Sequence, residues 1–256
     1  MEIKFIDDEN CSEDARTIIK FVNCPHKIIS KDNTEEDVNK EYEKAFIRGK
    51  SEGFVPVLVP ADATLAEWFG IEDEDEDYCK EKIIENERKE TRSGVRILEE
   101  NYKQYLEDYC EDYDQGEEEF LGELGNGGDI DELSSFSDFR GGIEETILFE
   151  IPVKNPWEVI AWLPFGGWNE CPAPLEMMAI CHYWYDEYKA IPAAITHDQL
   201  EFVLENPISD EETAWKVAKQ HYAFCADRVD QCTETGTLGE VADCILNSRV
   251  WYFWWD

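Results

Sequence analysis

A histidine and a cysteine, His221 and Cys225, lie four residues apart in a segment with the pattern of an amphipathic helix. Residues at this spacing share one helix face, where they could ligate a metal ion or form a thiol–imidazole pair for nucleophilic catalysis. A structural zinc site needs two further ligands, and no Cys-x-x-Cys pair occurs in the chain. We therefore expect a core histidine with its hydrogen bonds satisfied and no bound metal or other cofactor. A metal site and a nucleophilic pair are the alternatives.

A second group of candidate residues lies in a turn-rich loop at 163–172, where Gly166 and Gly167 permit backbone torsions that other residues avoid. Cys171 in this loop is a further candidate nucleophile. A purely structural role is the other interpretation: Trp168 would then fill the core, Asn169 would cap the next helix, and Cys171 would sit buried in a tight turn. If the loop binds a partner, the residues that we expect to take part in and around it are Trp168, Asn169, Glu170, His182 and Asp227.

The charge of the chain limits its partners. There are 60 acidic and 23 basic residues among 256, so the formal net charge is −37. Such a surface repels nucleic-acid phosphates and anionic lipids, which are bound through basic groups. It attracts a basic protein, a metal ion or a cationic substrate. We expect no nucleic-acid or membrane partner, and we expect a cytoplasmic protein because no signal peptide or membrane span is recognisable.

The nine cysteines support this expectation. Their number is odd, and we expect no export signal because none is recognisable. In a reducing compartment such cysteines remain thiols, and thiols of this kind are mostly buried. We therefore predict reduced, mostly buried cysteines.

Residues 1–70 have the pattern of a small α/β part. Ser12 can cap a first helix, and a second helix is predicted over 34–51. Short apolar runs at 27–30 and 55–59 predict strands before and after this second helix. We therefore predict a strand–helix–strand unit, with a right-handed crossover if the two strands are parallel.

Residues 71–145 are predicted to form an acidic, partly helical or mobile insertion. The segment 71–150 contains 28 acidic and 8 basic residues, so it carries more than half of the net charge. One or two helices are expected, one of them over about 96–110. The acidic run at 72–77 lacks the ligand spacing of an EF-hand loop. We interpret it as a solvated segment.

Residues 146–256 are predicted to be the most ordered part of the chain. The expected elements, in order, are a strand at 146–151, a short helix or buried strand at 157–162, a helix from Pro174, a hairpin of 193–196 and 200–204, a helix capped by Ser209 and ending near Phe224, a helix at 238–247, and a strand from Val250. The last strand is apolar on both faces, which predicts a central strand covered on both sides.

Several motifs of this region occur together in a recognisable order. They are Leu163-Pro-Phe-Gly-Gly-Trp-Asn-Glu-Cys-Pro172, His182-Tyr-Trp-Tyr185, Ala194-Ile-Thr-His-Asp-Gln-Leu-Glu201, His221-Tyr-Ala-Phe-Cys-Ala-Asp227 and Trp251-Tyr-Phe-Trp-Trp-Asp256. With them, residues 150–256 resemble the bacterial "domain of unknown function 4253" family. The resemblance implies an α+β domain in the bacterial cytosol and brings no agreed reaction.

Taken together, the sequence predicts an α+β fold with a mixed sheet flanked by helices, in three parts at 1–70, 71–145 and 146–256. The functional hypothesis is a non-enzymatic bacterial binding protein of the immunity or inhibitor type, whose acidic surface binds a basic protein such as a nuclease toxin. One alternative is a hydrolase-like enzyme that uses Cys171 or the pair His221 and Cys225. Another is an acidic mimic of DNA, with carboxylates spaced like phosphates along one elongated face.

Overall fold

The computed structural model describes residues 3–74, 79–89, 93–113, 116–138 and 140–256. The side chains of the predicted solvated run at 72–77 lie outside the described part of the chain. The described chain forms two compact units, each built from several segments: unit 1 contains 1–88, 132–165 and 192–201, and unit 2 contains 89–131, 166–191 and 202–256. The three predicted parts are divided by amino-acid composition along the chain. The two units are divided by which residues pack together, so their boundaries differ from the predicted ones.

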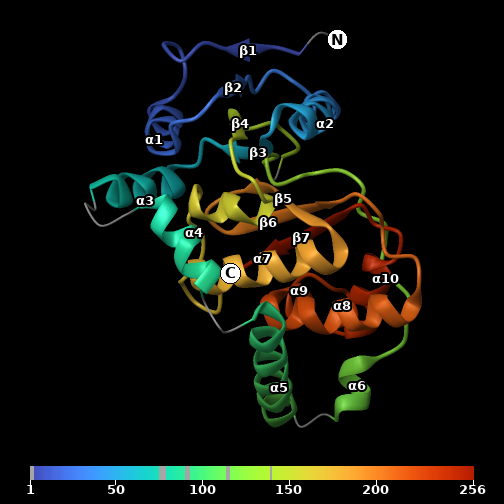
Figure 1. Cartoon of the computed structure of the whole chain (residues 1–256). Coiled ribbons are helices and arrows are strands. Elements are labelled where there is room, and N and C mark those ends of the chain that lie inside the picture. Colours follow the sequence, from blue (N-terminus) through green and yellow to red (C-terminus); the bar gives the residue numbers. More distant parts are fainter. Residues whose placement is uncertain (1–2, 75–78, 90–92, 114–115, 139) are drawn as a thin grey trace. The chain divides into compact units, whose positions relative to one another are not determined.

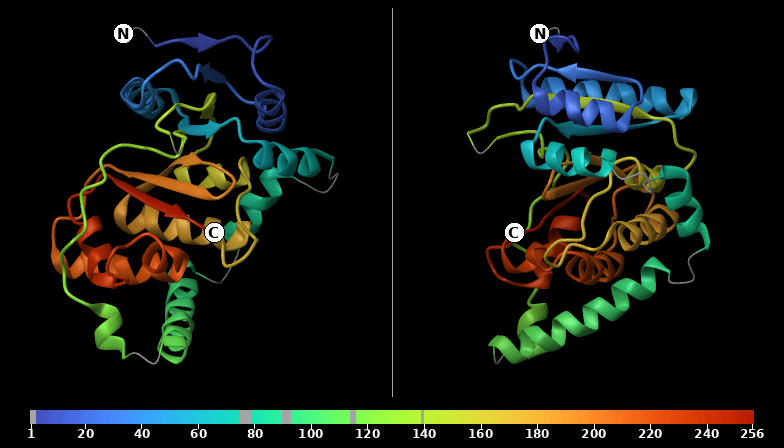
Figure 2. Two further views of the ribbon diagram at one scale, coloured as in Figure 1. Left: turned by 180° about the vertical axis from the view of Figure 1, so that it is seen from behind. Right: turned by 90° about the vertical axis from the view of Figure 1, so that its left-hand side faces the viewer.

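Unit 1 is built around paired strands with helices beside them (Figure 1). Its elements are β1 (Phe5–Ile6), α1 (Glu13–Val22), β2 (His26–Ile29), α2 (Glu35–Glu52), β3 (Val55–Pro60), α3 (Ala63–Glu74), nearly all of α4 (Lys80–Lys89), β4 (Thr146–Ile151) and the 3-10 helix η1 (Pro156–Ala161). Helices α1 and α2 lie on opposite sides of the strands, both from the front (Figure 1) and from behind (Figure 2, left). The segment predicted as either a short helix or a strand is thus helical.

Local capping explains where the first two helices begin. The Ser12 side chain accepts a hydrogen bond from the backbone N–H of Ala15, as predicted. Thr34 and Asp37 form a reciprocal capping box at the start of α2. Gly53 ends α2 with φ +83°, in the left-handed region that glycine adopts without strain.

Strand β4 lies between the two strands of the predicted strand–helix–strand unit. It pairs antiparallel with β2, where Lys27 faces Leu148, and antiparallel with β3, where Leu58 faces Leu148. Strands β2 and β3 are therefore parallel to each other but not neighbours. The separate apolar runs predicted both strands, but the strand inserted between them comes from about 90 residues further along the chain.

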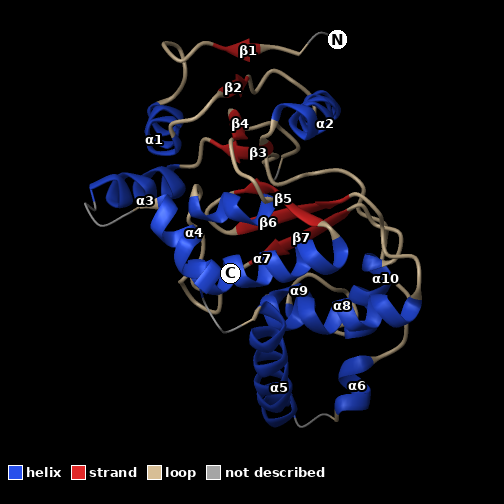
Figure 3. Cartoon of the chain, in the orientation of Figure 1, coloured by secondary structure: helices blue, strands red, loops and turns tan. Residues whose placement is uncertain are grey.

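The sheet has seven strands in the order β1-β2-β4-β3-β5-β6-β7 and is mixed, because β3 and β5 pair in parallel at Leu58 and Ala194. Strands β5 (Ala190–Ile195) and β6 (Gln199–Leu204) are the predicted hairpin, and the division between the two units falls within them. The predicted α+β class with a mixed sheet and helices is confirmed (Figure 3).

A buried carboxylate in unit 1 fixes a loop against β6. Glu201 is fully buried, and its carboxylate accepts hydrogen bonds from the backbone N–H groups of Ser134 and Ser135, each at 3.0 Å. Burial raises the pKa of Glu201, while these donors favour the ionised form. The side chain therefore satisfies a turn that would otherwise leave buried N–H groups without acceptors.

Unit 2 is mostly helical (Figure 3). Its elements are α5 (Gly94–Tyr113), α6 (Glu117–Leu121), α7 (Pro174–Tyr188), α8 (Glu211–Phe224), α9 (Asp227–Asp230), α10 (Leu238–Ile245) and β7 (Val250–Trp254). Helix α5 packs against both α7 and α8. It approaches α7 so closely that a Cβ on Gly94 would lie 2.2 Å from the Ala179 carbonyl oxygen. The helix predicted over 96–110 is confirmed as α5.

Two sequence predictions are corrected in unit 2. Asp210, not Ser209, caps α8, because its side chain accepts a hydrogen bond from the Thr213 backbone N–H. Strand β7 is the last strand in the sheet order, not a central one. Apolar residues on both faces of a strand indicate that both faces are covered. They do not indicate that another strand pairs with each edge. Part of the edge of β7 is occupied by a loop, since the Val250 N–H donates to the Ile130 carbonyl oxygen.

The aromatic side chains of β7 form the core of unit 2. Phe253 is fully buried, with its ring centroid 4.8 Å from Phe224 and 5.6 Å from Trp184. Trp251 and Trp255 on the same face are also buried, whereas Tyr252 and Trp254 on the opposite face are half-buried. Within the described residues, no helix combines the length and the apolar character needed to cross a bilayer.

Candidate functional site

A cavity of about 510 Å³ opens within unit 2. Its walls come from α5, the loop before α7, the first turn of α7, and the ends of α8 and α9. The lining residues are Asn101, Gln104, Tyr105, Asp108, Tyr109, Asn169, Glu170, Cys171, Pro172, Ala173, Glu176, Tyr222, Ala226 and Asp230. This volume lies within the range of pockets that hold small molecules or single side chains.

Two glycines shape the loop that reaches the cavity. Gly166 and Gly167 have φ values of +94° and +85°. A Cβ on Gly166 would lie 2.1 Å from the Pro172 carbonyl oxygen, so a larger residue does not fit. The Gly167 N–H donates to the carbonyl oxygens of Cys171 and Pro172, at 3.2 and 3.1 Å. The loop closes on itself and presents its tip, residues 169–173, to the cavity.

A chain of hydrogen bonds ties this loop to β7 and α9. The Asn169 side-chain amide donates to the Asp256 carbonyl oxygen at 2.6 Å, and the Asp256 N–H donates to Asp227 Oδ2 at 3.1 Å. Gln231 Nε2 donates to the other oxygen of Asp227 at 2.6 Å. Two predicted binding residues, Asn169 and Asp227, thus meet in one network. Asp227 positions the cavity wall and does not itself line the cavity.

The cavity is electrostatically one-sided. Four carboxyl groups line it, from Asp108, Glu170, Glu176 and Asp230, and no lysine or arginine is among its described lining residues. Partial burial, with Asp227 and Glu170 nearby, raises the pKa of Asp230 from 3.8 to about 6. The site therefore holds several carboxylates close together, and a bound cation would reduce the repulsion among them.

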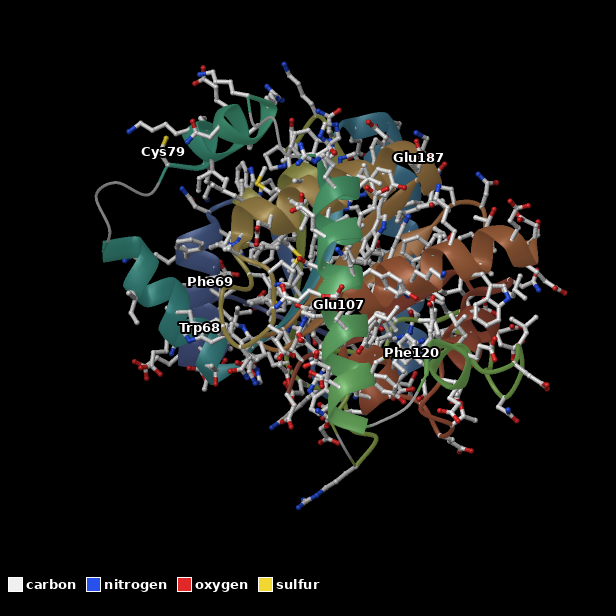
Figure 4. The ribbon with its side chains drawn as sticks, turned by 90° about the horizontal axis from the view of Figure 1, so that it is seen from below. Trp68, Phe69, Cys79, Glu107, Phe120 and Glu187 are labelled. Atoms are coloured by element: carbon white, nitrogen blue, oxygen red, sulfur yellow. The ribbon has the colours of Figure 1, made fainter. Side chains whose placement is uncertain are left out.

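Aromatic rings form the rest of the wall. Burial and the neighbouring acids raise the pKa of Tyr105 to about 12, so its hydroxyl group is neutral at pH 7. The Tyr105 and Tyr222 ring centroids are 6.1 Å apart at 81°. Phe120 of α6 (Figure 4) supports this wall, with its centroid 4.6 Å from that of Tyr109 and 4.7 Å from that of Tyr222. Electron-rich ring faces beside carboxylates are the surroundings that organic cations prefer.

The thiol of Cys171 lies on this wall with 4% of the residue exposed. Burial raises its pKa well above the ordinary value, partly opposed by a hydrogen bond with the Gly167 backbone. The thiolate is the reactive form of a cysteine. At neutral pH this side chain is therefore a protonated thiol.

The other candidate nucleophile, the pair His221 and Cys225, lies in the core of unit 2. The Cys225 thiol donates to the Trp254 carbonyl oxygen at 3.1 Å. The His221 ring lies 4.7 Å from Trp251 and 4.6 Å from Phe253, between centroids. Burial, assisted by nearby Arg228, lowers the pKa of His221 well below 6.5, so the ring is neutral. His221 is therefore a buried core histidine, but the expected hydrogen bonds are absent, because neither ring nitrogen has a partner among the described residues.

The remaining predicted residues lie outside the cavity lining. His182, on α7, is half-exposed, and its Nε2 lies 3.5 Å from Asp186 Oδ2. Trp168 is half-buried in the glycine loop. Among the described residues, no group of three or more His, Cys, Asp or Glu side chains is arranged to hold a metal ion. Of the predicted binding residues, Asn169 and Glu170 line the cavity.

Comparison with known families places most of this site in one domain. Residues 147–256 match the family model for the domain of unknown function DUF4253. The resemblance noted from the sequence motifs is thereby confirmed for the C-terminal region. No curated protein and no solved structure matches the chain.

The DUF4253 region supplies the loop, the first turn of α7 and the α8–α9 wall. The α5 wall, with Tyr105 and Asp108, comes from the acidic segment outside the match. Sequence reasoning missed this wall, because an acidic amphipathic helix shows which face is apolar but not which partner it meets.

Proposed function

We propose that this chain is a non-enzymatic binding protein of the immunity or inhibitor type, which binds a basic partner protein such as a toxin. The cavity receives a lysine or arginine side chain of that partner. The observation that carries this proposal is the cavity lining: four carboxyl groups and three tyrosines, with no basic residue among the described lining residues.

The arrangement suits an organic cation better than a metal ion. A guanidinium group offers several N–H donors in one plane and can bind carboxylates that lie apart, and tyrosine faces attract cations through their ring quadrupole. A metal ion would need its ligands gathered around one point, which the described residues do not provide. The net charge of −37 adds long-range attraction for a basic partner.

The proposal includes a location in the bacterial cytoplasm. All nine cysteines are free thiols, a state that a reducing compartment maintains. Burial raises the pKa of the thiol of Cys24 to about 12, so this half-buried cysteine is unreactive at neutral pH.

The enzyme alternative has one observation in its favour, the position of Cys171 on the cavity wall. Its buried, protonated thiol weighs against nucleophilic attack, and among the described residues its hydrogen-bond partner is the Gly167 backbone, not a base. For this reason the binding role is the main proposal.

The test compares two neutralised pairs of carboxylates. The cavity variant is E170Q/D230N, and the control variant is E107Q/E187Q, which removes the same charge from exposed positions on α5 and α7 (Figure 4). Each tagged protein is incubated at low ionic strength, about 20 mM, with a lysate of the cells that encode it. Bound proteins are identified and quantified by mass spectrometry.

We expect the wild type and the control to retain the same basic protein, and the cavity variant to retain about tenfold less, as the loss of two charge-assisted contacts implies. Equal retention by all three proteins would show that the cavity carboxylates take no part in binding, and an equal loss in both variants would assign the effect to overall charge. If the wild type retains no basic protein, the proposal is wrong.

A further inference from the structure

A second hollow of unit 2 has the opposite character. It is a groove of about 400 Å³ between α5 and α8, and most of its exposed surface is apolar. The residues that line it are Val95, Leu98, Glu99, Tyr102, Trp215, Lys216, Lys219 and Gln220. None of them lines the acidic cavity, so the two hollows are separate.

The charges at this groove are unusual for so acidic a chain. Lys216 and Lys219, three positions apart on α8, face one acid, Glu99, in the described lining. Neither lysine forms an ion pair with any described residue. Instead, Lys219 Nζ lies 5.4 Å from the centre of the Tyr102 ring, and Lys216 Nζ lies 5.8 Å from that of Tyr188. Two ammonium groups are thus held beside the groove by aromatic rings.

The aromatic floor of the groove is firmly placed. Tyr102 packs edge-on against Tyr222, with the centroids 6.4 Å apart. Its hydroxyl oxygen is buried and has no hydrogen-bond partner in the described part of the chain. Gln220, at the other wall, is held by the Trp184 indole N–H at 2.9 Å. Packing thus holds Tyr102 and a hydrogen bond holds Gln220, and the Tyr102 hydroxyl is a buried polar group at the groove.

We propose that this groove binds a small amphipathic carboxylate, whose apolar body lies on Leu98, Tyr102 and Trp215 and whose carboxylate lies between Lys216 and Lys219. The apolar lining selects the body of the ligand by burial of its surface. The two unpaired ammonium groups select an anionic head. The body can be an alkyl chain or an aromatic ring, and this site does not depend on the basic partner proposed above.

The experiment measures binding by isothermal titration calorimetry with the full chain. The probes are decanoate and its neutral analogue decan-1-ol, and 1-naphthylacetate with 2-(1-naphthyl)ethanol as the aromatic pair. The lysine variant is K216Q/K219Q. Its matched control is K82Q/K103Q, which removes two exposed lysines outside the groove. A third variant, Trp215→Ala, removes apolar surface from the groove.

We expect at least one carboxylate to bind more tightly than its alcohol. K216Q/K219Q should weaken that carboxylate about three- to tenfold, as two partly exposed charge pairs allow, and leave the alcohol unchanged. Trp215→Ala should weaken both members of the pair, and the control should weaken neither. Circular dichroism of each variant shows that it is folded.

Three results would overturn the proposal. The first is that neither carboxylate binds. The second is equal affinity for carboxylate and alcohol, which would leave the lysines without a role. The third is an equal loss in K82Q/K103Q, which would assign the effect to overall charge and not to the groove.

Discussion

The ionisation of Asp230 links the cavity to pH. Its folded-state pKa of about 6 lies above the ordinary 3.8, so the protonated form is favoured on folding. The stabilisation is complete below about pH 4 and is lost as pH rises through about 6. A bound cation needs the ionised form, so binding releases a proton near pH 6 and weakens as pH falls from about 7 to about 5.

The prediction is therefore that affinity for the basic partner falls between pH 7 and pH 5 in the wild type, and that Asp230→Asn is weaker at pH 7 with a flatter profile. Carbon-13 NMR of the Asp230 carboxyl group gives its pKa directly. Asp227→Asn should lower that pKa, because it removes a neighbouring negative charge. An Asp230 that titrates near 4 would contradict this account of the cavity.

The cysteines allow a direct choice between binding and catalysis. Buried Cys171 and Cys225 should react with iodoacetamide at least about tenfold more slowly than half-exposed Cys79 and Cys244, because their thiols are both shielded and protonated. Mass spectrometry of peptides from briefly labelled native protein measures the four rates, and the unfolded protein provides the control. If Cys171 is labelled first, its thiol is activated and the enzyme alternative becomes the better one.

At the scale of elements, local signals predicted well. Helices α1, α2 and α7 begin where a capping side chain or Pro174 starts them, because such bonds form between residues only a few positions apart. Ser209 and Asp210 are both good caps by type, so their order in the sequence could not show which one α8 uses. The hairpin β5–β6 also followed from its short turn.

Long-range pairing could not be predicted. Strand β4 was recognised as a strand, but nothing in its residues says that it pairs between β2 and β3. The position of β7 at the end of the strand order is of the same kind, since side chains report which faces are covered and not which edges are paired. The cavity could not be predicted for the same reason, because its walls come from segments that lie far apart in the sequence. Glu170 was a candidate, whereas Tyr105 and Asp108 gained significance only when α5 was seen beside α7 and α8.

The two faces of β7 should differ in their contribution to stability. Phe253→Ala should lower the free energy of unfolding by about 3–5 kcal/mol, because a fully buried ring is replaced by a cavity. Trp254→Ala, on the half-buried face, should cost clearly less, about 1–2 kcal/mol, although the ring is larger. Urea unfolding followed by circular dichroism measures both values. Equal losses would mean that the strand is covered alike on its two faces.

At the scale of the whole molecule, a net charge of −37 acts in opposite directions on folding and on binding. Repulsion among carboxylates destabilises the compact state, and salt at about 0.5 M shortens the screening length to about 4 Å. We therefore expect the midpoint of thermal unfolding to rise by several degrees between about 20 mM and 0.5 M sodium chloride, roughly the effect of 1–2 kcal/mol on a chain of this size.

Over the same range, affinity for the basic partner should fall at least tenfold, since attraction between exposed charges is screened as repulsion is. Calorimetry of unfolding and titration of the partner, each repeated with sucrose in place of salt, separate screening from general solvent effects. The diagnostic result is that salt raises the midpoint of thermal unfolding and lowers the affinity for the partner. A partner that binds equally well in high salt would be held by apolar contacts, and the acidic cavity would then not be its docking site.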